Sequence, residues 1–162
     1  MVYQPFEMYN LEVKQGFTLI ELLIVVAIFL FAAAMTPSFF GNWLARQTLD
    51  EEVDQLVQNF HLARERALTG WHGDNQGICF KSTPDFDSYI LYHGASCAAR
   101  VVADDQEVKL PSSIRLSDTW TDSDLNFNTT GVPQAPGAAT LAHEVYGERV
   151  VEVNQLGLTI TP

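Results

Sequence analysis

The sequence predicts an α+β protein in which a long N-terminal helix packs on an antiparallel β-sheet headpiece. Three observations lead to this fold class. Residues 17–35 form an apolar run with one charge, and residues 49–67 carry apolar side chains at helical spacing. From residue 78 onward, short strand-like runs alternate with turn residues. We therefore expect a helix with a membrane half and an amphipathic half, followed by a β-rich domain.

The composition limits the classes of function. The chain has 162 residues, of which 47% are hydrophobic, enough for one domain with a core of its own. Nine Lys and Arg face 20 Asp and Glu, for a net charge of −11, and such acidity disfavours binding to a phosphate backbone. Since no Ser-His-Asp, Cys-His or phosphate-loop pattern is present, we expect no catalytic residue, no cofactor and no enzymatic activity.

The apolar run reads FTLIELLIVVAIFLFAAAM over residues 17–35. At about 1.5 Å per residue its length nearly matches a bilayer core of about 30 Å, so it predicts a transmembrane helix. A secretory signal peptide is the alternative, with Ala32–Ala34 imitating its cleavage site, but the run is long for that purpose and the helix continues beyond it. Glu21 is the single charge, and a carboxylate near the end of a lipid-facing helix is expected to have a partner.

The helix is predicted to continue to Thr69. Pro37 predicts a kink or local melting, because proline removes a backbone hydrogen bond and clashes with the preceding turn. Gly70 is expected to end the helix. Between them, apolar residues recur at steps of three and four and define the face expected to pack on the sheet: Leu49, Val53, Leu56, Phe60, Ala63 and Ala67.

The headpiece is read as a series of short strands with turn signals between them. The last two strands form a hairpin around the turn at residues 154–157. The expected strands are residues 77–81, 88–93, 107–110, 114–117, 125–127, 149–153 and 158–161.

The N-terminal string Gly16-Phe-Thr-Leu-Ile-Glu21, followed by the apolar run, resembles the processing site of type IV prepilins and type II secretion pseudopilins. The resemblance implies a leader peptide over residues 1–16, cleavage between Gly16 and Phe17 by a membrane prepilin peptidase, and N-methylation of Phe17. Glu21 would then pair with the α-amino group of Phe17 in a neighbouring subunit, and so set the register of assembly. The leader departs from the family pattern, because it holds two glutamates and one lysine whereas family leaders are usually basic.

Later segments resemble the headpiece of the minor pseudopilin GspH and the minor pilin FimT. They are residues 62–67, 78–80, 125–131 and, after a further strand, 149–157. With the N-terminal motif, the resemblance covers about residues 14–161. It implies a low-copy structural subunit of a type IV pilus or type II secretion filament, near the tip or in a priming complex.

The resemblance also implies an organisation, a location and partners. Residues 1–16 are the leader, 17–35 the transmembrane and filament-core helix, 36–70 the amphipathic half and 71–162 the headpiece. The precursor is expected in the cytoplasmic (inner) membrane as a single-pass protein, with membrane lipid around its helix and its headpiece outside the cytoplasm, and the mature subunit in a periplasmic or surface filament. Its expected partners are other pilins, the prepilin peptidase, an assembly platform and an ATPase.

The alternative is a DNA-uptake or adhesive tip subunit. Some FimT-like proteins bind DNA through a C-terminal Gly-Arg-x-Arg element, but the corresponding residues 157–160 read Gly-Leu-Thr-Ile. Both arginines are absent, so DNA is not an expected partner. The choice between secretion, motility and DNA uptake, and between a minor and a major subunit, stays open.

The cysteines and histidines suggest little chemistry. Cys79 and Cys97 are either bridged or two small buried thiols, and a bridge suits an exported headpiece. Since none of the histidines (His61, His72, His93 and His143) lies at metal spacing with a second ligand, we predict no metal site. Acidic loops at residues 104–105 and 118–124 lack a calcium-loop motif. Trp71 and Trp120 are expected to pack in the core or cap the helix.

Overall fold

The protein is described by a computed structural model covering residues 17–160, without the side chains of residues 34–40 and 42. The chain divides into two compact units, Met1–Phe40 and Gly41–Pro162. Helix α1 (Leu19–Leu68) begins in the first unit and continues into the second. The helix runs through Pro37, so of the two predicted alternatives, a kink or local melting, the structure excludes the melting. Proline removes one hydrogen bond of the helix, and the flanking turns keep theirs.

The predicted end of the helix at Gly70 is confirmed. Gly70 has φ of 65°, in the left-handed region that a residue without a Cβ adopts freely, and its N–H donates to the carbonyl of Ala67 at 3.2 Å. The elements that follow are η1 (Trp71–Gly73), β1 (Gln76–Ser82), β2 (Asp87–His93), η2 (Val102–Asp104), β3 (Gln106–Lys109), β4 (Ile114–Asp118), η3 (Thr121–Ser123), β5 (Asp124–Phe127), β6 (Gly137–His143), β7 (Gly147–Val153) and β8 (Thr159–Ile160).

The strands form two antiparallel four-stranded sheets, with orders β3-β2-β1-β5 and β4-β6-β7-β8. The α+β fold class is confirmed, but the headpiece holds two sheets rather than one. The predicted C-terminal hairpin is present, with Glu152 opposite Ile160 and Val153 opposite Thr159. Strand β6 is the further strand expected before residue 149, whose bounds were not predicted, and it lies in the second sheet between β4 and β7.

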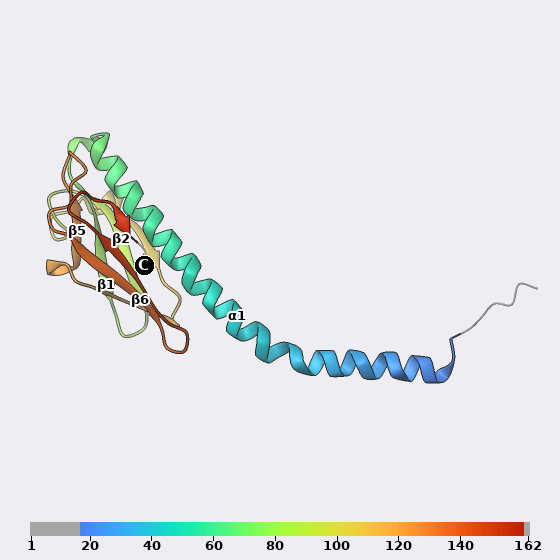
Figure 1. The fold of residues 1–162 in the computed structure, drawn as a ribbon. Coiled ribbons are helices and arrows are strands. Elements are labelled where there is room, and N and C mark those ends of the chain that lie inside the picture. The colour runs from blue at the N-terminus through green and yellow to red at the C-terminus, as the bar shows by residue number, and fades with distance from the viewer. Residues whose placement is uncertain (1–16, 161–162) are drawn as a thin grey trace, which may run out of the picture. The chain divides into compact units, whose positions relative to one another are not determined.

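The second half of α1 lies along the strands and buries its apolar stripe against them (Figure 1). All six predicted stripe residues are buried, from Leu49 to Ala67. At the middle of the stripe the Phe60 ring makes edge-to-face contacts with Phe80 of β1 and with Trp120, which stack on each other. Trp120 is therefore a core residue, as expected.

A buried carboxylate joins the two sheets. Asp87, at the start of β2, is 1% exposed. Its Oδ1 accepts a hydrogen bond from the Ser82 hydroxyl at 2.7 Å, and its Oδ2 accepts one from the backbone N–H of Leu116 in β4, also at 2.7 Å. The Arg115 guanidinium lies 3.9 Å from Oδ1. One side chain therefore satisfies groups in both sheets and offsets the cost of its own burial.

Both sheets are open, and their edge strands are short. In the first sheet the edges are β3 and β5, of four residues each, and in the second they are β4, of five residues, and β8, of two. Charged residues occupy three of the four edges, including Glu107 and Lys109 in β3 and Arg115 in β4. Short and charged edges resist pairing with a strand from another molecule.

Candidate functional site

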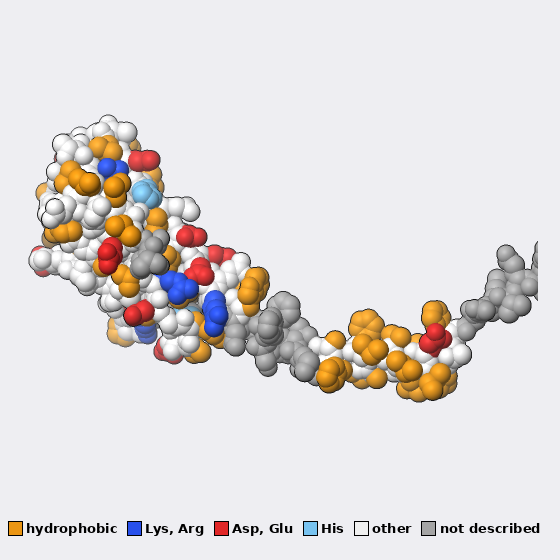
Figure 2. Space-filling model, in the orientation of Figure 1, with side chains coloured by type: hydrophobic (Ala, Val, Ile, Leu, Met, Phe, Trp, Pro, Cys, Tyr) orange, Lys and Arg blue, Asp and Glu red, His pale blue; other side chains and the backbone are white. Residues whose placement is uncertain are grey.

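The first unit presents an apolar surface. Phe17 is 88% exposed, and the side chains from Leu19 to Phe31 that carry large hydrophobic groups are at least 46% exposed. Figure 2 shows hydrophobic side chains along the length of this segment. A soluble monomer rarely exposes so much contiguous apolar area, so this segment requires a covering of lipid or of other apolar helices.

The start of α1 is a capping box built from Thr18 and Glu21. The Glu21 backbone N–H donates to the Thr18 hydroxyl oxygen at 3.3 Å, and the Glu21 carboxylate accepts from the Thr18 backbone N–H, also at 3.3 Å. The reciprocal pair satisfies backbone N–H groups that the first turn of a helix leaves free, and the carboxylate also faces the positive end of the helix dipole. Thr-x-x-Glu, which residues 18–21 carry, is the sequence signal for this motif.

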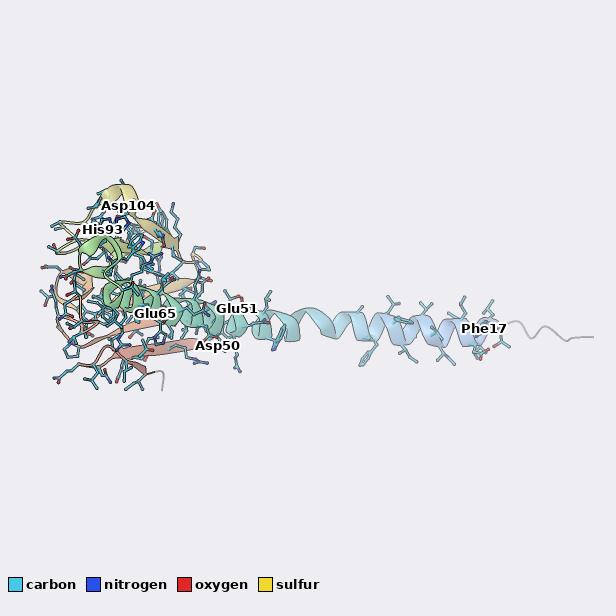
Figure 3. The ribbon with its side chains drawn as sticks, turned by 90° about the horizontal axis from the view of Figure 1, so that it is seen from above. Phe17, Asp50, Glu51, Glu65, His93 and Asp104 are labelled. Carbon is cyan, nitrogen blue, oxygen red and sulfur yellow. A yellow bond between two sulfur atoms is a disulfide. The ribbon has the colours of Figure 1, made fainter. Side chains whose placement is uncertain are left out.

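Phe17 and Glu21 lie within the described chain, and Gly16 does not. Phe17 directly precedes Thr18, at the start of the described chain, and is labelled in Figure 3. Gly16, on the other side of the expected cleavage point, lies outside the described residues. Glu21 is exposed, so its carboxylate is accessible to a partner beyond Thr18.

Residues 13–36 match the family model of the prokaryotic N-terminal methylation motif. The match supports a type IV pilin-like protein. The matched residues include Gly16, Phe17 and Glu21, at which the sequence predicts cleavage, methylation and pairing between subunits. Neither the curated proteins nor the solved structures contain a match to this chain.

The motif supports a membrane-anchored precursor that is later assembled into a filament. It also suggests other pilins and a prepilin peptidase as partners. It points to a structural role rather than catalysis. Over the described residues, no helix combines the length and the hydropathy needed to cross a bilayer.

The headpiece contains a disulfide between Cys79 of β1 and Cys97, whose Cα atoms are 5.4 Å apart. Cys97 lies in the loop after β2, and its backbone N–H donates to Asp124 Oδ2 at 2.9 Å. The other oxygen of Asp124 accepts a hydrogen bond from the Tyr92 hydroxyl, which in turn accepts from the Asn126 amide at 2.9 Å. The disulfide and this polar network together hold the loop against the first sheet.

Removing the disulfide is expected to destabilise the headpiece by about 3 kcal/mol, because the crosslink limits the freedom of the unfolded loop between the two cysteines. The measurement is urea unfolding of the full-length chain in detergent, followed by tryptophan fluorescence, for C79A/C97A against wild type. Reductant should lower the wild-type midpoint and leave that of the double variant unchanged. A wild-type midpoint insensitive to reductant would contradict this prediction.

Three loops at one end of the headpiece bring two histidines and an aspartate together. His72 belongs to η1, His93 ends β2, and Asp104 ends η2; Figure 3 labels the last two side by side. The His93 Nε2 atom lies 2.9 Å from Asp104 Oδ2, and the His72 ring stacks on the His93 ring with centroids 4.6 Å apart. The structure therefore brings together groups that show no metal spacing in the sequence, and the prediction of no metal site stays a prediction. Residues 72, 93 and 104 are too far apart in the sequence for spacing to reveal a contact made by folding.

The loop that carries His72 is held in a fixed conformation. His72 has φ of 57°, uncommon for a residue with a side chain. The buried amide of Gln76 donates to the carbonyls of Trp71 and Asp74, at 2.9 and 3.3 Å. The Trp71 ring lies edge-on to both histidine rings and carries the Arg66 guanidinium on its face, 4.7 Å from the ring centre. Trp71 thus packs at the end of α1, as expected.

The electrostatics of this cluster follow from the burial of His93, whose side chain is 6% exposed. Its hydrogen bond to Asp104 holds the pKa of that carboxyl below the usual value. On the opposite side of the ring, Nδ1 lies 3.7 Å from Asp74 Oδ2, too far for a hydrogen bond. The predicted acidic loop at Asp118, Asp122 and Asp124 forms no comparable group among the described residues.

Proposed function

We propose that this protein is a minor pilin or pseudopilin, a structural subunit of a type IV pilus or type II secretion filament. The observation that carries the proposal is the string from Gly16 to Glu21 at the head of an exposed apolar helix. In this role the helix packs among other helices in the filament core, and the headpiece faces outward. No turnover is involved.

The N-terminal residues have separate roles in the proposal. Prepilin peptidase cleaves between Gly16 and Phe17, and the new N-terminus is methylated. The α-amino group of Phe17 then meets the Glu21 carboxylate of a neighbouring subunit in an apolar environment, where an ion pair is far stronger than in water. The exposure of Glu21, which shares its carboxylate only with the adjacent Thr18 backbone and hydroxyl, supports this second contact.

The proposed location is the cytoplasmic membrane before assembly. Residues 17–35 form a single-pass anchor, and the headpiece lies outside the cytoplasm. Two observations support this arrangement. The large hydrophobic side chains from Leu19 to Phe31 are exposed, and the headpiece carries a disulfide, which persists in oxidising compartments. An assembly platform and an ATPase are the proposed machinery that extracts the subunit.

The proposed subtype is the GspH/FimT group of low-copy subunits. The segments that resemble this group take ordered places in the headpiece: residues 62–67 lie in α1, 78–80 in β1 and 125–127 in β5. The charge of the chain does not support a DNA-uptake role. The net charge is −11, and residues 157–160, which correspond to the DNA-binding element of some FimT-like proteins, contain no arginine.

Mass spectrometry of the mature N-terminus tests the proposal. We expect membrane and sheared-filament fractions to contain a chain that begins at Phe17 and is one methyl group heavier than its sequence. A strain without prepilin peptidase supplies the control and should retain Met1. A chain that begins at Met1, or after Ala34, while the peptidase is active would refute the proposal.

A further inference from the structure

The cluster at the end of the headpiece contains an imidazole with an unsatisfied nitrogen. His93 is buried, and its Nδ1 has no hydrogen-bond partner. Two carboxylates flank the ring, Asp104 at 2.9 Å from Nε2 and Asp74 at 3.7 Å from Nδ1. A neutral imidazole has one N–H, so when it donates to Asp104, the Nδ1 lone pair faces the oxygen of Asp74. A buried acceptor opposite another acceptor is unfavourable, and a cation at the cluster removes the conflict.

We propose that His72, His93 and Asp104 form a binding site for a divalent transition-metal ion of the zinc class. One ligand atom from each residue lies within 4.8 Å of the others. Zinc holds nitrogen and oxygen ligands at about 2.0–2.2 Å, which puts two ligands of a tetrahedral site about 3.3 Å apart. The 2.9 Å between His93 Nε2 and Asp104 Oδ2 therefore needs to widen by only a few tenths of an ångström.

Metal binding at Nε2 also provides Nδ1 with a partner. The ion takes the place of the proton between His93 and Asp104, and that proton moves to Nδ1, where it donates to Asp74. A carboxylate behind a metal-bound imidazole is the usual outer-sphere arrangement, which orients the ring and raises its basicity. Asp74 is thus a positioning residue, and its 3.7 Å separation from Nδ1 closes to a hydrogen bond.

The second histidine supplies the adjustable ligand. The rings of His72 and His93 are nearly parallel, 9° apart, so one ion cannot lie in the plane of both. His72 is exposed, and its ring turns toward the ion without disturbing the core. Two imidazoles select zinc, copper or nickel over calcium and magnesium, which prefer all-oxygen sites. Three protein ligands leave a fourth position for water or for a donor from another molecule.

The competing explanation is that His93 is an imidazolium, with both nitrogens protonated and one aspartate on each side. It requires no metal, and it predicts that the headpiece does not take up zinc. The two explanations differ in the role of the exposed His72. It is a ligand in the metal site, whereas an imidazolium between Asp74 and Asp104 makes no hydrogen bond to it. Variants of His72 therefore distinguish them, because His93, Asp74 and Asp104 all stay in place when the His72 ring that stacks on His93 is removed.

The test is calorimetric titration of zinc into the full-length, untagged chain in detergent at neutral pH. We expect one saturable site per chain. H72A and D104N should each weaken binding at least tenfold, and D74N about tenfold, the size usual for outer-sphere carboxylates. H61A is the matched control, because His61 is an exposed histidine of α1 that bonds Thr159, and it should bind as wild type. Cobalt bound to wild type should show the visible absorption of a tetrahedral site, and H72A should lose it.

Near-UV circular dichroism of each variant establishes that the fold is intact. A folded wild-type chain that takes up no zinc would overturn the proposal in favour of the imidazolium. Equal weakening by H61A and H72A would overturn it in favour of adventitious surface binding. The outcome is independent of the filament assignment, since the titration requires no assembly.

Discussion

Replacing Glu21 by glutamine is expected to leave leader cleavage and the headpiece intact and to lower incorporation into filaments at least tenfold. Glutamine completes the capping box with Thr18 as glutamate does, so the start of α1 keeps its hydrogen bonds. Only the charge is lost, and in the proposed pair the α-amino group of a neighbouring Phe17 is then left without a counter-ion in an apolar setting. Breaking such a buried pair costs about 3–5 kcal/mol.

The matched control is T18V, which removes the hydroxyl of the capping box and keeps the carboxylate. Its cost is confined to the helix start and is about 1 kcal/mol. The measurement is the ratio of subunit in sheared filaments to subunit in membranes, by quantitative mass spectrometry. Equal ratios for E21Q and wild type would remove the proposed role of the charge, and a loss in T18V as large as that in E21Q would assign the effect to the cap.

The second large effect is expected at Asp87. D87A should destabilise the headpiece by about 3–5 kcal/mol, since it leaves the Leu116 N–H and the Ser82 hydroxyl without their acceptor and places Arg115 beside an empty site. Urea unfolding of the full-length chain in detergent measures the loss, with the fluorescence of the buried Trp120 among the signals.

Two further variants identify the cause. D87N keeps the volume and one acceptor oxygen, so its loss should fall between those of wild type and D87A. D85A removes an exposed carboxylate from the adjoining turn and should change stability by less than about 0.5 kcal/mol. If D85A and D87A lost the same amount, the turn rather than the link between the sheets would account for the effect.

Local features of the fold could be predicted from the sequence, because each depends on residues that are neighbours within one helix or one hairpin. The stripe from Leu49 to Ala67 repeats at helical spacing, and the structure buries every member. Gly70 was predictable for the same reason, since a left-handed turn after a helix favours glycine. The β7–β8 hairpin is likewise local, with its pairing set by the turn at residues 154–157.

Features made by residues distant in the sequence were missed or, as with the strand expected before residue 149, left without bounds. Strand β6 contains four small residues among its seven, including Ala138 and Ala139, and lacks the β-branched alternation that marks a strand. Its place is fixed by β4 and β7 on either side, and hence by the second sheet that one-dimensional patterns do not reveal. The His72, His93 and Asp104 cluster likewise arises where three loops meet, and only the fold brings those loops to one end.

The short edges of the two sheets have a consequence for crowding. In the proposed filament, headpieces lie at a high local concentration. The filament is proposed to grow by packing of the N-terminal helices, so pairing between headpiece strands would compete with assembly. Strand β8 is two residues long and offers almost no edge on which a neighbour's strand could pair. Strand β3 carries Glu107 and Lys109, whose charges disfavour pairing with another strand. In the proposed filament, adjacent headpieces can therefore touch without pairing their strands into a continuous sheet.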